Sequence, residues 1–224
     1  MIKELFCDTE TTGTDLMKHG LFMIGGIIRI NGVVKQEFSL KCDVFEEDEF
    51  APDAIAKHGF TSEQIRRFPD PYETYLEFVR ILGGHVDKFN KQDKFFFINF
   101  GAEFDAKFLR RWCESNGDQY FGSWFWHPWI DIMSLAAQDL KKVRHTMPNF
   151  QLQTICEKYG VKVDPTEQHR DPLYDARIAM RVYDQIIAKQ QIPALPPGPV
   201  NPVEMPDGTY QYRLDKGFKT DPRR

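Results

Sequence analysis

Apolar residues along the chain form short strand-like runs, separated by longer segments with helical periodicity. The strand-like runs cover residues 5–8, 21–30, 33–40 and 95–99, and an extended segment is expected near residues 129–132. The second and third runs flank Asn31-Gly32, which is typical of a two-residue hairpin turn. We therefore expect these two runs to form an antiparallel extension of the first strand.

Between these runs, apolar residues recur three, four and seven positions apart, as they do on one face of a helix. Helices are expected as short pieces within 51–67 and near residues 72–82, 103–112, 134–141, 151–159 and 173–189. Gly83-Gly84 ends the helix over 72–82. Strands alternating with helices predict an α/β fold, in which helices cover the faces of a mixed central sheet.

The composition changes sharply after Gln191, where six prolines fall within a short span. Proline cannot continue a helix, so an extended linker is expected there. The preceding residues are sufficient for one sizeable core and insufficient for a second full domain. We therefore predict one domain over residues 1–190, followed by a proline-rich linker and C-terminal tail over residues 191–224.

Two carboxylates, Asp8 and Glu10, stand two residues apart at the end of the first strand-like run. Residues two apart on a strand point to the same side, so both side chains should project together. Thr11, Thr12 and Gly13 follow, with small side chains and free backbone amides. The pattern indicates a hard-metal site beside a loop that a ligand approaches closely. Taken alone, it is more typical of a strand that enters solvent through acidic residues.

Two further acids lie on the apolar faces of predicted helices. Asp105 precedes Phe108 and Leu109 by three and four positions, and Asp175 has the same relation to Ile178. A buried, unpaired carboxylate is costly or becomes neutral, so this placement requires a partner. Each acid alone is equally compatible with a capping role at a helix start. Four inward-facing acids together favour a divalent cation, and ligands that are all oxygens favour Mg²⁺ or Mn²⁺.

The three acidic segments together resemble the motifs of the DnaQ-like 3′–5′ exonucleases, the DEDD group with the RNase H-like fold. The first motif matches at Asp8-Thr9-Glu10-Thr11-Thr12-Gly13, the second at residues 102–109, and the third at His169 followed by Asp175-Ala176. The resemblance covers residues 3–189. It implies hydrolysis of phosphodiester bonds at 3′ ends, with release of nucleoside 5′-monophosphates, by two Mg²⁺ or Mn²⁺ ions about 3.5–4 Å apart.

The resemblance also assigns roles to the acids. Asp8 would bridge both ions, Glu10 and Asp175 would complete the ion that activates water, and Asp105 would act mainly through coordinated water near the second ion. His169 would be the general base of the histidine subclass (DEDDh), a role that suits an imidazole with a pKa of about 6.5. Five residues separate it from Asp175, whereas the subclass usually has four.

For the substrate, the resemblance implies that Thr11 and Thr12 hold the terminal nucleotide and that Phe104 packs near its base. Packing within the helix core is the alternative for Phe104. Gly101 stands where the family often has an asparagine. We interpret that asparagine as a supporting residue of the site and not as a metal ligand. We expect single-stranded DNA, or frayed or mismatched 3′ ends, as the substrate. The alternatives are an exoribonuclease that trims RNA and an inactive, nuclease-like binding module.

The formal net charge of −4 does not suggest a sequence-independent duplex binder. Basic groups on predicted helices, such as Lys107, Arg110 and Arg111, either contact phosphates or form ordinary solvated faces. The C-terminal tail could dock on a polymerase, clamp or other replication partner, pack back on the domain, or stay disordered.

The four cysteines are scattered and lack the density of a disulfide scaffold, so a reducing, cytoplasmic environment is expected. The apolar run over residues 21–30 is too short to span a bilayer, and no membrane association is expected. The strand-like amino terminus leaves no room for a leader peptide.

Overall fold

The computed structural model describes residues 1–164 and 171–189, together with the backbone of residues 202–204 and 210–212. The chain divides into two compact units, Met1–Lys189 and Gln190–Arg224. Within the second unit, β6 (Pro202–Glu204) and β7 (Tyr210–Tyr212) pair antiparallel, which the proline-rich composition did not predict. The rest of the predicted linker and docking tail lies outside the described residues.

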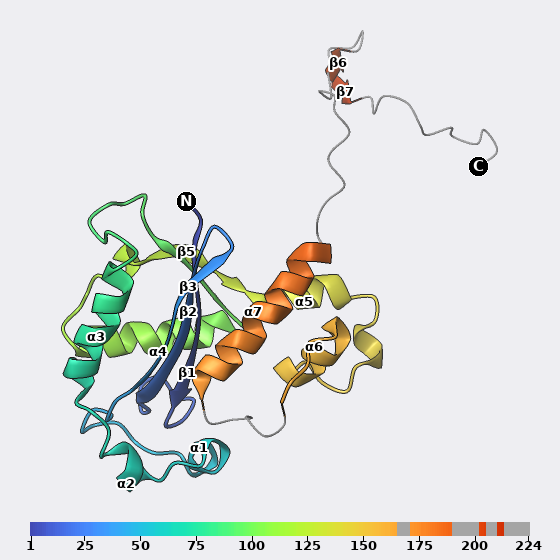
Figure 1. Cartoon of the computed structure of the whole chain (residues 1–224). Coiled ribbons are helices and arrows are strands. Elements are labelled where there is room, and N and C mark those ends of the chain that lie inside the picture. The colour runs from blue at the N-terminus through green and yellow to red at the C-terminus, as the bar shows by residue number, and fades with distance from the viewer. Residues whose placement is uncertain (165–170, 190–201, 205–209, 213–224) are drawn as a thin grey trace. The chain divides into compact units, whose positions relative to one another are not determined.

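Five strands form a mixed sheet in the first unit, in the order β3-β2-β1-β4-β5 (Figure 1). At its centre, β1 (Lys3–Thr11) runs antiparallel to β2 (Leu21–Ile30) and parallel to β4 (Phe95–Asn99). On the two edges, β3 (Val33–Lys41) pairs antiparallel with β2, and β5 (Phe125–Asp131) pairs parallel with β4. The predicted mixed sheet is confirmed.

The turn between β2 and β3 has the geometry that its sequence predicts. Both central residues have positive φ angles, 49° at Asn31 and 79° at Gly32. This is the geometry of a type I′ turn, whose twist matches that of the flanking strands. Ile30 and Val33 accordingly face each other in register on either side of the turn.

The helices closely follow the predicted segments. They are α1 (Pro52–His58), α2 (Ser62–Ile65), α3 (Pro71–Gly83), α4 (Ala102–Ser115), α5 (Ile132–Leu140), α6 (Leu152–Tyr159) and α7 (Pro172–Lys189). Two 3₁₀ turns, at Phe121–Ser123 and Arg144–Thr146, were not predicted. No helix within residues 1–164 and 171–189 is long and apolar enough to cross a membrane.

The last strand of the sheet is longer than predicted and ends one residue earlier. It spans Phe125–Asp131, whereas the sequence suggested an extended segment over 129–132. Pro128 obscured it, because proline cannot donate to a strand ladder and is tolerated only at a sheet edge, where β5 lies. Asp131 then accepts a hydrogen bond from the backbone N–H of Met133 at 3.0 Å and caps α5, so Ile132 is helical.

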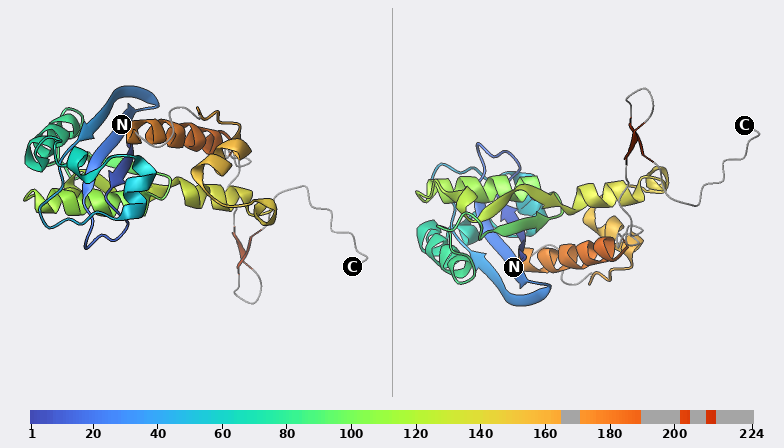
Figure 2. Two further views of the ribbon diagram at one scale, coloured as in Figure 1. Left: turned by 90° about the horizontal axis from the view of Figure 1, so that it is seen from below. Right: turned by 90° about the horizontal axis from the view of Figure 1, so that it is seen from above.

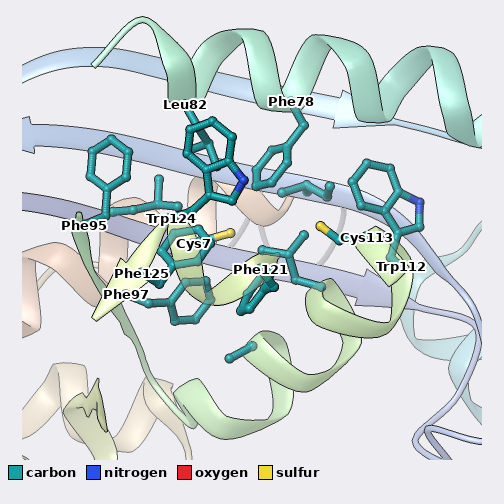
Figure 3. Packing of buried hydrophobic residues seen from close by; sticks show 14 of the residues in the cluster. Cys7, Phe78, Leu82, Phe95, Phe97, Trp112, Cys113, Phe121, Trp124 and Phe125 are labelled. Carbon is teal, nitrogen blue, oxygen red and sulfur yellow. The ribbon is translucent and has the colours of Figure 1, made fainter. Parts of the chain in front are cut away.

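Helices α3 and α4 cover one face of the sheet, and α5, α6 and α7 cover the other (Figure 2). Side chains of β1 alternate between the two layers. Cys7 packs with Phe78 of α3 and Trp112 of α4 (Figure 3), whereas Phe6 packs among residues of α7. Asp8, two residues beyond Phe6, therefore lies on the face that α7 covers.

Two aromatic residues at the start of the last strand belong to the buried core. Trp124 and Phe125 are 4% and 2% exposed. Phe125 packs edge-on against Phe97, with ring centres 5.5 Å apart (Figure 3). All four cysteines are free and buried.

Candidate active site and metal centre

Three of the predicted acids, Asp8, Glu10 and Asp175, meet at the carboxyl end of β1. Each offers one carboxylate oxygen, and these oxygens lie within 4.8 Å of one another. The two-residue period of β1 places Asp8 and Glu10 on one face of the sheet, and the first turn of α7 brings Asp175 to that face. The structure therefore unites residues from motifs that are more than 160 positions apart.

A glycine in β2 allows α7 to approach the sheet so closely. Gly25 lies opposite Asp8 in the register of β1 and β2. A Cβ atom at position 25 would stand 2.0 Å from the backbone N of Leu173 and 2.2 Å from the backbone carbonyl carbon of Pro172. Only glycine leaves room for this backbone contact. The contact fixes the first turn of α7 against the strand beside Asp8, and thereby positions Asp175.

The fourth acid, Asp105, projects from α4, and its carboxylate accepts hydrogen bonds from neighbouring residues. Its Oδ1 accepts hydrogen bonds from the backbone N–H and the hydroxyl of Thr9, at 3.0 and 2.8 Å, and its Oδ2 accepts one from Asn99 at 2.7 Å. Burial raises the pKa of Asp105 to about 6, although these hydrogen bonds act in the opposite direction. Asp105 thus borders the group of three acids and does not belong to it.

Asn99 connects two of the acids, and it was not predicted as a site residue from the sequence. Its Nδ2 donates to Oδ1 of Asp8 at 2.9 Å and to Oδ2 of Asp105 at 2.7 Å, and the residue is only 1% exposed. One signal was available. Asn99 is the polar last residue of a buried strand, and the carboxyl ends of parallel neighbouring strands lie at the same edge of a sheet.

The acids destabilise one another's charged forms. Burial raises the pKa of Asp8 well above its ordinary value, and the charges of Asp105 and Asp175 raise it further. Burial also raises the pKa of Glu10 to about 7, while the positive charge of Lys57 acts to lower it. A divalent cation would relieve this repulsion, and ligands that are all oxygens suit Mg²⁺ or Mn²⁺. The residues present therefore fit such an ion.

A cleft of about 570 Å³ opens beside Asp175. Its walls carry apolar side chains such as Phe100 and Phe150, and the amides of Gln151 and Gln153. Lys57, at the end of α1, is exposed and also lines the cleft. The cleft therefore combines apolar surface, amides, one cation and one metal-site acid. Lys57 could not be identified from the sequence, because its proximity to the acids depends on the placement of α1.

The sequence model of the family described as "Exonuclease" (RNase_T) matches residues 5–183, which include all four acids. The chain belongs to this exonuclease family. The match confirms the DnaQ-like resemblance seen in the order of the acidic motifs, and it does not extend to the histidine subclass. No curated protein sequence is similar enough to this exonuclease-family chain to count as a relative.

Solved structures of exonucleases share the fold at low sequence identity. Exonuclease I from Methylocaldum szegediense superposes with a TM-score of 0.64 at 16% identity, and the match covers 85% of this chain and 41% of that one. A zinc-bound complex of E. coli exonuclease I with single-stranded DNA gives 0.67 at 16% identity, with the same coverage. The exonuclease-family chain thus spans about 41% of these exonuclease I chains, and the likeness confirms the RNase H-like fold.

A further structure has a length closer to that of the exonuclease-family chain. It is a 3′-exonuclease described for 3′-end-specific recognition of a histone mRNA stem-loop. The two share a TM-score of 0.61 and 16% identity, and the match covers 85% of this chain and 84% of that one.

In the exonuclease-family chain, Thr11 and Thr12 hold the loop that follows β1. The hydroxyl of Thr12 donates to the carbonyl of Glu49 at 2.6 Å and accepts from the backbone N–H of Gly20 at 2.9 Å, and the residue is fully buried. The hydroxyl of Thr11 donates to the carbonyl of Gly13 at 2.7 Å. These bonds give both threonines a structural role, and their contact with a nucleotide stays a prediction.

Phe104 and His169 are the remaining predicted site residues. Phe104 is 38% exposed, and its ring packs on Phe108 with ring centres 4.7 Å apart. Helix packing therefore accounts for only part of its surface, and its contact with a base stays a prediction. His169 lies outside the described residues.

Arg111 forms contacts within the protein. The prediction that it either contacts phosphates or lies on a solvated helix face was therefore wrong for this residue. It donates to the carbonyls of Leu16 and His19, at 2.7 and 2.6 Å, and pairs with the buried Asp48 at 2.7 Å. Arg111 thus fastens the loop after β1 to α4. The sequence could not reveal this, because arginine on a helix face is ordinarily exposed.

Proposed function

We propose that the protein is a metal-dependent exonuclease that removes nucleotides from the 3′ ends of nucleic acid, with single-stranded DNA or frayed or mismatched 3′ ends favoured. The main support is the group of three carboxylates, whose oxygens lie within 4.8 Å of one another in a chain of the exonuclease family. The position of Asp175 at the edge of a cleft with apolar and polar walls is compatible with a strand end as substrate. The reaction would release nucleoside 5′-monophosphates.

In the proposed mechanism, Asp8, Glu10 and Asp175 would hold the divalent ions, and Asp105 would contribute through water. The bound ions would supply a nucleophile at neutral pH and neutralise charge on the phosphate. Thr9 and Asn99 would keep the carboxylate of Asp105 in one orientation. By the family resemblance, His169 would accept the proton of the attacking water.

The cleft suggests where a strand would lie. The positive charge of Lys57 acts to lower the pKa of Glu10, and Lys57 also lines the cleft. We propose that its ammonium group binds a phosphate oxygen. Phe100 and Phe150 would contact bases or sugars, since apolar and aromatic surfaces accept any base. The exposed part of Phe104 would contact the terminal base, as the resemblance implies.

A second candidate is an exoribonuclease that trims RNA. It is favoured by the coverage of the structural matches, because the 3′-exonuclease described with a histone mRNA stem-loop matches this chain over 84% of its own length. The exonuclease I structures are covered over only 41%.

The test is the digestion of 5′-labelled single-stranded DNA and RNA of matched sequence in the presence of Mg²⁺. A ladder that shortens from the 3′ end, lost in Asp175→Asn and kept in Asp184→Asn on the same helix, is the expected result. The preferred substrate would separate the two candidates. Binding without cleavage by the wild-type protein, with Mg²⁺ or Mn²⁺, would contradict both and favour the inactive binding module.

A further inference from the structure

We propose that Asn99 is a positioning residue that determines the metal affinity of the site, because one amide group holds both Asp8 and Asp105. This inference rests on the proposed function. It concerns a residue outside the three acidic motifs, and it follows from two hydrogen bonds, at 2.9 and 2.7 Å, that start from the same nitrogen.

The geometry gives Asn99 little freedom. The Nδ2 atom carries two hydrogens, and each is directed to a different carboxylate. The residue is 1% exposed and ends β4, which pairs with the strand that carries Asp8. Water therefore cannot readily replace either bond, and the amide position is fixed by the sheet.

Asp105 provides the second fixed point. Its other oxygen, Oδ1, accepts two hydrogen bonds from Thr9, the neighbour of Asp8 on β1. Asp8, Asn99, Asp105 and Thr9 thus form a continuous chain of contacts from one strand to the next and back through α4. Through this chain, the orientation of the Asp8 carboxylate is coupled to the position of Asp105.

An amide suits this position because it is neutral. A lysine or arginine would pair with the acids and reduce their attraction for a cation, whereas an amide orients them and leaves their charge in place. Outer residues that bond to metal-binding carboxylates typically change metal affinity or activity by about 10–100-fold when they are replaced. We expect an effect of this size for Asn99.

The experiment measures Mn²⁺ binding to the full chain by titration calorimetry, without nucleic acid. Asn99→Leu has a similar shape and no donor, so it should weaken Mn²⁺ binding about 10–100-fold. Asn99→Ser keeps one donor that cannot reach both acids, and it should also weaken binding. The matched control is Asn116→Leu, which removes an amide bonded to the carbonyl of Trp112 beyond the other end of α4 and should leave the affinity unchanged.

A kinetic readout separates positioning from general damage. With excess Mn²⁺, the Asn99 variants should keep the wild-type KM for an oligonucleotide, while the Mn²⁺ concentration for half-maximal rate rises. Thermal unfolding with EDTA checks the fold, and if Asn99→Leu does not fold, Asn99→Ser decides. Wild-type Mn²⁺ affinity in a folded Asn99 variant overturns the inference. A wild-type protein that binds no Mn²⁺ would instead overturn the proposed function.

Discussion

The two ends of β1 both carry buried charges, and they differ in how those charges are balanced. At the amino end, Lys3 pairs with Asp93, and Glu4 accepts hydrogen bonds from Arg29 at 2.7 and 3.1 Å. Arg29 also donates to Asp184 of α7 at 2.6 Å. Burial alone would lower the pKa of Arg29, but the bonds to the two carboxylates raise it above its ordinary value.

At the carboxyl end of the same strand, the charged groups in the cluster have one sign. Asp8 and Glu10 face Asp175 of the same helix α7, and burial and mutual repulsion raise the pKa values of Asp8 and Glu10. Lys57 is the cation that opposes this effect at Glu10. Strand β1 and helix α7 therefore contact each other in two places. At one, an ion-pair network balances the buried charges and stabilises the fold. At the other, the carboxylates require cations to balance their charge.

Asp8→Asn should have the largest effect, and in opposite directions on activity and stability. Cleavage should fall below detection, because a neutral amide cannot hold a cation as a carboxylate does. The metal-free protein should unfold at a higher temperature than wild type, since one source of repulsion is removed and the amide oxygen can still accept the bond from Asn99. Thermal unfolding in EDTA and the 3′-end assay measure the two effects. A lower unfolding temperature for Asp8→Asn than for wild type in EDTA would show that repulsion between the acids contributes little to stability.

Arg29→Met tests the opposite end. It leaves Glu4 buried without its cation, which should cost about 3–5 kcal/mol of unfolding free energy. It also removes the guanidinium that lies 4.7 Å from the ring centre of Phe6. Urea unfolding measures the loss. Arg80→Met, which breaks an exposed pair with Glu77 on α3, is the control and should produce no measurable change.

Gly25→Ala should disturb the site through the backbone. The added methyl would clash with the start of α7, so Asp175 should move relative to Asp8, and a displacement of about 1 Å typically lowers turnover about 100-fold. The control is Gly26→Ala at the next position, where a Cβ would meet the ring of Phe38, which lies in the core on the α3 and α4 side. Both variants should be less stable than wild type. Only Gly25→Ala should lose more turnover than the decrease in its folded fraction explains. Equal turnover in the two variants would remove the proposed role of Gly25.

The smallest effect concerns pH. Burial raises the pKa of Glu10 to about 7 and that of Asp105 to about 6, so the folded state binds more protons than the unfolded state between about pH 4 and 7. The contribution of these acids to stability is therefore greatest at low pH and is lost as the pH rises through this window. Metal-free wild-type protein should lose more stability from pH 5 to pH 8 than Glu10→Gln, and Mg²⁺ should stabilise the wild type more at pH 8. An equal loss of stability between pH 5 and pH 8 in both proteins would contradict the raised pKa of Glu10.

The sequence predicted the acids of the site by simple periodicities. The period of β1 places Asp8 and Glu10 on one face, and helical spacing turns Asp105 inward; the structure confirms both placements. The boundaries of β5 were missed because a proline within an edge strand looks like a break. The structural role of Arg111 was missed because its partners come from a distant loop.

The sequence by itself thus determined which residues could bind a cation and on which side of each element they lie, because side-chain direction follows from the local backbone period. The tertiary structure alone decided which elements become neighbours. Asn99 reaches Asp8 across 91 positions because β4 pairs with β1, and Asp175 reaches it because Gly25 admits α7. Local periodicity carries no information about strand order or about the closest approach of two backbones, and both depend on packing of the whole domain.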